Sequence, residues 1–227
     1  MKRLFRRKPI ALANWKMEMT VAESLAFLRE FQALAGDLLS RVQVVLCPPY
    51  TALFAMAQAL GSRSPVELGG QTVSAEGGGA YTGQISAGLV ADAGGRWAQL
   101  GHWERRRHIG ETDETVNRQA HQALHAGLNL ILLVGERKGV AAAGVASAVD
   151  HQLSGVLQGC TAEQVRRMVF VYEPEWTIGV TQPAPVEHVA AGCSLVREWL
   201  VARFGLETAK ATRLAYGGSV SPAFASD

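Results

Sequence analysis

Four groups of polar or glycine residues, far apart in the sequence, each follow directly after a short apolar run. Such runs are typical of strands buried in a parallel sheet, and the carboxyl ends of these strands meet on one face of an α/β barrel. A lysine, an imidazole and a carboxylate on one face suit proton transfer next to a carbonyl group. The four groups are Asn14 with Lys16, His102 with Glu104, Glu173 alone, and Gly217 and Gly218 with Ser219.

These residue types divide the chemistry between them. The carboxylate of Glu173 would remove a carbon-bound proton, His102 would polarise or protonate the carbonyl oxygens, and Lys16 would stabilise negative charge. Backbone amides at Gly179 and at the Gly-Gly-Ser turn suit an anion such as phosphate. Each residue alone also has an ordinary structural explanation. Their joint placement predicts the isomerisation of a phosphorylated hydroxy-carbonyl compound.

Glu173 lies in the most informative stretch, residues 169–179. The run from Met168 to Tyr172 is almost wholly apolar, which predicts a strand buried on both faces, and the acid follows at its carboxyl end. Pro174 cannot continue a sheet ladder, and Gly179 provides a flexible point a few residues later. This order predicts a strand, an acid and then a lid.

Short apolar runs alternate with longer segments of helical periodicity along the chain, which predicts βα units around a parallel sheet. Seven units are visible, whereas a closed (β/α)8 barrel needs eight strands. A long glycine-rich loop, residues 71–83, follows the third strand. We expect strands over residues 10–13, 42–47, 66–70, 97–100, 128–134, 168–172 and 212–216. We expect helices after a Thr20/Glu23 capping box, over about 51–60, over 86–93, over 113–126 capped by Asp113, over 141–157, and from a first turn containing Pro185.

Composition indicates one globular domain over residues 1–227, with residues 1–8 as a basic tail. The chain is 48% hydrophobic and 19% charged, and no apolar run approaches the roughly 20 residues of a membrane span. The net charge of +2 comes partly from the tail, which argues against a nucleic-acid partner. Cys47, Cys160 and Cys193 have no disulfide or zinc spacing, which suggests reduced thiols in the cytoplasm. His121 and His125 lack a third ligand, so we expect no metal site.

Several motifs carry a resemblance over nearly the whole chain. Their order and spacing are similar to those of the triosephosphate isomerase family, which implies a TIM barrel. The motifs are Asn14-Trp15-Lys16-Met17, Leu100-Gly101-His102 with Glu104-Arg105-Arg106, Gly110-Glu111-Thr112-Asp113-Glu114, Gly135-Glu136, Tyr172-Glu173-Pro174 with Trp176 and Ile178-Gly179, and Tyr216-Gly217-Gly218-Ser219-Val220.

The resemblance implies a role for each matching residue. Glu173 would be the base and His102 the electrophile, a division of labour for which this family is itself the standard example. Lys16 and Asn14 would bind substrate, and Glu104 would support Lys16. Gly179 and Ser219 would hold the phosphate, with residues 174–184 as the lid.

The resemblance also implies no metal or organic cofactor, a phosphorylated sugar substrate and a homodimer. The dimer would form through the loop at residues 77–83, which begins at Gly77, ends at Gly83 and carries Tyr81 and Thr82.

The sequence departs from the family pattern at five places. Trp103 stands where the family has serine, Gln84 where the dimer loop has glutamate, and Leu133 where the fifth strand has cysteine. The lid reads Gly179-Val180-Thr181-Gln182-Pro183 in place of a Thr-Gly-Lys run. If the natural chain ends at Asp227, we expect a barrel open along one edge with part of the phosphate site absent.

Three functional hypotheses remain. The first is isomerisation of dihydroxyacetone phosphate and D-glyceraldehyde 3-phosphate. The second is the same chemistry on a tetrulose phosphate, because Trp103 and the altered lid would reshape the pocket. The third is a catalytically impaired paralogue with a binding role. A parallel assay on both sugar phosphates separates them.

Overall fold

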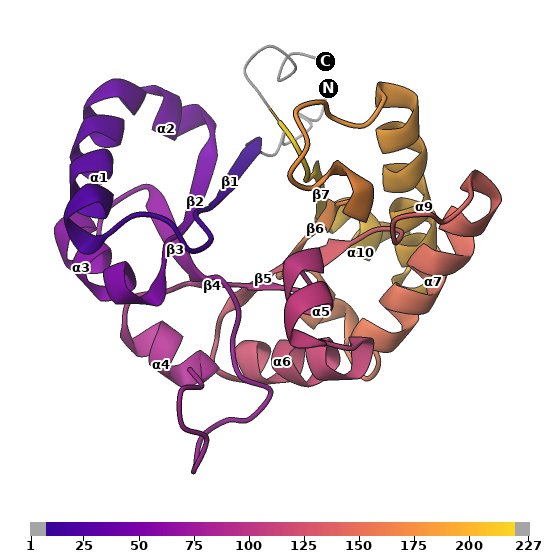
Figure 1. Cartoon of the computed structure of the whole chain (residues 1–227), viewed down its shortest axis with the longest axis horizontal. Coiled ribbons are helices and arrows are strands. Elements are labelled where there is room, and N and C mark those ends of the chain that lie inside the picture. The colour runs from indigo at the N-terminus through magenta and orange to yellow at the C-terminus, as the bar shows by residue number, and fades with distance from the viewer. Residues whose placement is uncertain (1–7, 221–227) are drawn as a thin grey trace.

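A computed structural model of the chain describes residues 8–220, and in it seven parallel strands pair in sequence order. The sheet curves into an incomplete ring with the helices outside it (Figure 1). Within the described residues the pairing runs from the first strand to the seventh and does not join these two. The strands are β1 (Ile10–Asn14), β2 (Gln43–Cys47), β3 (Val66–Gly70), β4 (Trp97–Leu100), β5 (Asn129–Val134), β6 (Met168–Tyr172) and β7 (Arg213–Tyr216).

Helices follow every strand except the seventh within the part of the chain that the structure describes. The longer ones pack on the outer face of the sheet, as the predicted α/β barrel requires (Figure 1). None of the helices within residues 8–220 is long and apolar enough to cross a membrane. They are α1 (Val21–Ala35), α2 (Leu38–Arg41), α3 (Tyr50–Leu60), α4 (Ala87–Asp92), α5 (Trp103–Ile109), α6 (Asp113–His125), α7 (Val145–Val156), α8 (Ala162–Val165), α9 (Val186–Phe204) and α10 (Leu206–Ala211), with short 3-10 helices η1 (Ala142–Gly144) and η2 (Glu175–Thr177).

Two apolar clusters hold the layers together, and the strands contribute to both. Side chains along a strand point alternately to opposite faces. On β5, Leu130 and Leu132 therefore pack against the helices, whereas Ile131 and Leu133 fill the barrel interior. This double burial explains why β5 and β6 read as continuous apolar runs in the sequence.

Most predicted elements are confirmed, with small shifts at their ends. The capping box at Thr20 and Glu23 is present at the start of α1. Two predicted caps are wrong: Thr112, one residue before Asp113, caps α6, and Pro185 is the N-cap of α9 and lies outside its first turn. Thr112 is the N-cap of α6 because its hydroxyl accepts a hydrogen bond from the Thr115 backbone N–H.

Short helices account for the larger misses. Residues 141–157, predicted as one helix, divide into η1 and α7. The sequence does not predict α2, α5, α8 or α10, because their four to seven residues are too few to show a clear apolar period. The predicted basic tail lies outside the described residues except for Lys8, which is exposed.

Gly192 on α9 provides a test of the packing between α9 and β6. Alanine is normally the better helix former by about 1 kcal/mol. A Cβ at this position, however, would lie 2.0 Å from the Cζ atom of the buried Tyr172 ring. We expect Gly192→Ala to lower the free energy of unfolding by about 1–3 kcal/mol, because the core is overpacked. Urea denaturation measures this.

The control is Ser194→Ala, at an exposed position on the same helix. It should leave the urea midpoint unchanged or raise it slightly. Equal midpoint shifts in both variants would contradict the proposed clash.

Candidate active site

One cavity of about 470 Å³ lies at the carboxyl ends of the strands. Its volume is within the range of small-molecule sites. Every predicted catalytic and substrate-binding residue lines it, although these residues come from both ends of the chain. They are Asn14, Lys16, His102, Glu173, Gly179, Gly217, Gly218 and Ser219.

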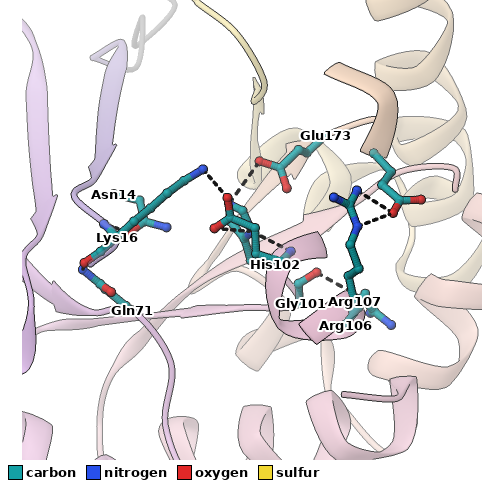
Figure 2. A network of polar contacts seen from close by, with 10 residues as sticks. Asn14, Lys16, Gln71, Gly101, His102, Arg106, Arg107 and Glu173 are labelled. Carbon is teal, nitrogen blue, oxygen red and sulfur yellow. Dashed lines mark hydrogen bonds and ion pairs between the residues drawn. The ribbon is translucent and has the colours of Figure 1, made fainter. Parts of the chain in front are cut away.

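Lys16 follows β1 in a strained backbone conformation. Its φ angle is 53°, which is unfavourable for a residue with a side chain. Hydrogen bonds hold it there: the Lys16 N–H donates to Asn14 Oδ1 at 2.9 Å, and Gln71 Nε2 donates to the Lys16 carbonyl at 2.7 Å (Figure 2). Gln71 also donates to the Cys47 carbonyl at the end of β2. From the sequence, Gln71 is expected only as the first residue of the long glycine-rich loop. Here it fixes the predicted substrate-binding lysine.

The Lys16 ammonium reaches across the ring to Glu104 on α5. The distance from Nζ to Oε1 is 2.6 Å, and both side chains are partly exposed. Glu104 therefore pairs with Lys16, although it does not line the cavity itself.

His102 is the N-cap of α5, and this fixes its tautomer. The backbone N–H of Glu104 donates to Nδ1 at 3.1 Å. Nδ1 is therefore an acceptor, and in the neutral ring the proton is on Nε2, which faces the cavity. Burial is the main cause that lowers the pKa of His102 to about 4; Glu104 opposes this shift and Lys16 adds to it. The imidazole is thus a neutral donor near pH 7.

Glu173 begins the loop after β6, and its carboxylate is buried beside His102. The distance from Glu173 Oε1 to His102 Nε2 is 3.6 Å, too long for a hydrogen bond. No group among residues 8–220 donates to Oε2. Burial raises the pKa of Glu173 to about 8, against the opposing effects of Lys16 and the backbone N–H of Trp103. The site therefore contains a buried carboxyl group with one unpaired oxygen next to a neutral imidazole, and the ionised form of this carboxyl is a stronger base than an exposed carboxylate.

The predicted phosphate-binding turn is in contact with the lid. The Ser219 N–H and hydroxyl both donate to the Thr177 carbonyl, and the hydroxyl also contacts the Val180 carbonyl. The Gly217 N–H donates to the Tyr172 carbonyl. In this conformation the lid and the strand end use these donors, so an anion would have to replace those carbonyls.

Two buried acids, to which the sequence pattern assigns no role, anchor the start of the predicted lid. Glu136 accepts hydrogen bonds from Tyr172, Trp176 and His188 at 2.7–2.8 Å. Burial raises the pKa of Glu136, but the hydrogen bonds from Tyr172 and Trp176 outweigh burial and bring the pKa below its ordinary value. Glu175 pairs with Arg107 of α5 at 2.7 Å (Figure 2).

Comparison with known proteins agrees with this geometry. The family profile described as Triosephosphate isomerase matches residues 9–227. The chain belongs to the triosephosphate isomerase family. It is 44% identical over 218 residues to the triosephosphate isomerase of Symbiobacterium thermophilum, covering 95% of this chain and 84% of that protein. Identity to the Carboxydothermus hydrogenoformans enzyme is 41%, covering 95% and 86%. The crystal structure of the Bartonella henselae triosephosphate isomerase superposes with a TM-score of 0.83 at 35% identity, covering 96% of this chain and 85% of that one.

The structure shows where three residues that depart from the triosephosphate isomerase pattern lie. Leu133 lies inside the barrel and lines the cavity, and Gln84 is exposed beyond the long loop. The indole of Trp103 is buried and points away from the Glu173 carboxylate, since its Nε1 donates to the Glu173 backbone carbonyl at 2.9 Å. Among residues 8–220, no three His, Cys, Asp or Glu side chains are placed to share a metal ion.

Glu173 makes the stability of the fold depend on pH. Its pKa is about 8 in the folded chain and close to the ordinary 4.5 in the unfolded one, so the folded state holds an extra proton between these values. Stability contributed by that proton is lost as the pH rises through this window. Glu173→Gln has no such proton to lose. We therefore expect this variant to gain stability relative to the unsubstituted protein between about pH 5 and pH 9.

The gain is at most a few kcal/mol, because one pKa unit corresponds to about 1.4 kcal/mol. Urea midpoints of both proteins at the two pH values measure it. A stability difference that does not change with pH would contradict the raised pKa of Glu173.

Proposed function

We propose that this protein interconverts dihydroxyacetone phosphate and D-glyceraldehyde 3-phosphate. The observation that carries the proposal is the shared cavity, in which a buried carboxylate and a neutral imidazole face the same space and a lysine lies at its edge. The related proteins bear the name of an enzyme with this activity. The residue roles below are our assignment.

Glu173 is the base that moves the proton between the two carbons. Its carboxylate accepts the proton from the carbon next to the carbonyl group and returns it to the neighbouring carbon. A carboxylate with a pKa raised by burial is a stronger base than an exposed one, and a pKa near the working pH favours transfer in both directions.

His102 and Lys16 handle the charge that develops on oxygen. The Nε2–H of His102 donates to the carbonyl oxygen as it becomes the enediolate, and the neutral ring then carries protons between the two oxygens. The Lys16 ammonium stabilises the negative charge of both enediolate and phosphate. Asn14 acts on the substrate side and also holds the Lys16 backbone.

The phosphate is assigned to the Gly179, Gly217, Gly218 and Ser219 end of the cavity. Gly179 has a φ angle of 72°, and a Cβ there would meet no atom within 4 Å. Backbone amides at such turns suit an anion. Closure of the lid, residues 174–184, would exclude water from the enediolate.

The structure favours the triose over the tetrulose hypothesis. Trp103 was one of two features expected to reshape the pocket, yet it is absent from the residues that line the cavity. The altered lid is the remaining support for a longer substrate. Retention of all three catalytic groups in one cavity argues against an impaired paralogue.

We also assign this protein as a homodimer formed through the loop at residues 77–83. This loop protrudes from the body between β3 and α4 (Figure 1), and Tyr81 within it is exposed. Met17 is 96% exposed beside the active site. Exposed apolar side chains of this kind suit burial against a second copy. Free thiols at Cys47, Cys160 and Cys193 are compatible with the cytoplasm.

The activity test is an assay of triose phosphate isomerisation with Glu173→Gln as the inactive variant. The amide cannot accept the proton, so kcat should fall by a factor on the order of 10² to 10⁴ or more. Glu198→Gln, the same substitution at an exposed position on α9, should keep full activity. An inactive unsubstituted protein, or equal activity in both variants, would reject the proposal, and activity on a tetrulose phosphate alone would support the second hypothesis.

The dimer is tested by sedimentation of the purified protein. We expect a mass of two chains, and we expect Tyr81→Asp to shift the protein toward one chain, because a charge would be buried in the interface. Leu206→Asp places the same charge at another exposed apolar position and should leave the mass unchanged. A single-chain mass for the unsubstituted protein would contradict the assignment.

A further inference from the structure

Two side chains of α5 reach back to backbone carbonyls beside the active site. Trp103 Nε1 donates to the carbonyl of Glu173 at 2.9 Å, and Arg106 Nε donates to the carbonyl of Gly101 at 3.0 Å (Figure 2 shows the arginine contact). One of these carbonyls belongs to the base itself. The other belongs to the residue before the catalytic imidazole. Neither donor lines the substrate cavity.

The two side chains also support each other. The Arg106 guanidinium carbon lies 5.7 Å from the centre of the Trp103 ring, a distance at which the cation and the ring face attract. Arg106 is also paired with Asp113 at the start of α6 at 2.7 Å. Trp103 is only 6% exposed, so water does not compete for its hydrogen bond. The pair forms a buried clamp between the ends of β4 and β6.

The backbone beneath this clamp is packed too closely to be held by side chains of its own. A Cβ on Gly101 would lie 2.8 Å from the Leu133 carbonyl, and one on Gly135 would lie 2.3 Å from the Glu173 carbonyl. The three strand ends therefore meet backbone to backbone. The sheet ladder and the Glu173 N–H, which donates to the Val134 carbonyl at 2.8 Å, join these strand ends, and α5 adds two hydrogen bonds from outside the sheet.

We propose that Trp103 and Arg106 are positioning residues that set the distance between the base and the imidazole. This inference rests on the proposed isomerase function. Trp103 holds the backbone of Glu173 in one position. The carboxylate therefore extends from a fixed point, and its unpaired oxygen stays directed at the substrate. Arg106 fixes the peptide from which His102 projects. Both act through catalytic residues and touch no substrate.

Trp103→Phe removes the indole N–H and keeps an aromatic ring over Arg106. Because a misplacement of about 1 Å can lower a rate about 100-fold, we expect kcat to fall by about 10-fold to 100-fold. KM should change by less than about threefold, since the groups that hold the ground state are untouched. Steady-state kinetics well below the melting temperature measure both.

The matched control is Trp97→Phe. Trp97 is also buried, and its Nε1 donates to Glu67 at 2.9 Å, but it lies at the opposite end of β4 from the active site. It should lower the melting temperature as Trp103→Phe does while leaving kcat within about twofold. Arg106→Lys, which keeps the charge but loses the planar donor fork, is a second test variant and should lower kcat with KM little changed.

The outcomes are distinct. A fall in kcat for Trp103→Phe or Arg106→Lys, without one for Trp97→Phe, supports the inference. Equal kcat in all three folded variants overturns it, even if melting temperatures fall. An unsubstituted protein without triose phosphate activity rejects the proposed function itself. If Trp103→Phe does not fold, Arg106→Lys against Trp97→Phe decides alone.

Discussion

A carboxylate that is buried and only partly hydrogen-bonded is the constraint on which the rest of the site depends. Removing an ionised carboxylate from water is unfavourable unless donors compensate it, and Glu173 has only weak compensation. The stabilising charge of Lys16 is attenuated because Glu104 pairs with it at 2.6 Å. The result is an acid that keeps its proton to higher pH, and whose ionised form is stabilised by any proton or hydrogen-bond donor brought to it.

The same arrangement keeps His102 neutral. A buried imidazole next to a carboxylate would ordinarily become a cation, because the opposite charge favours it. Here burial and Lys16 oppose that outcome, and the helix that begins at His102 presents its positive end to the ring. Glu173 and His102 are therefore both largely uncharged near pH 7. The 3.6 Å between Glu173 Oε1 and His102 Nε2 is a contact between two uncharged groups. In an ion pair, Glu173 would be a weaker base and His102 would be a cation.

Much of this was predictable from sequence, because the responsible patterns are local. The apolar run of β6 ending at Glu173 predicts the strand, its burial and the position of the acid. The eight candidate site residues, all of which line the cavity, were identified from the strand ends and from the loop glycine Gly179. What the sequence did not reveal were contacts between segments with no local pattern. Gln71 bonds to Lys16 across 55 residues and Trp103 to Glu173 across 70. The sequence predicted only that Trp103 would reshape the pocket, because the direction of its side chain follows from α5, a helix too short to predict.

The lid and the phosphate donors are linked through the same hydrogen bonds. Ser219 donates to the carbonyls of Thr177 and Val180, so a phosphate that takes this serine must release two points of the lid backbone. Glu136 and Glu175 hold the start of the lid through Trp176 and Arg107, a few residues before Gly179, whose φ angle of 72° allows the chain to turn. A ligand can shift a conformational equilibrium only by its different affinity for the two states. In the proposed function that difference has a physical source, because a bound anion and the carbonyls of Thr177 and Val180 would compete for the same donors.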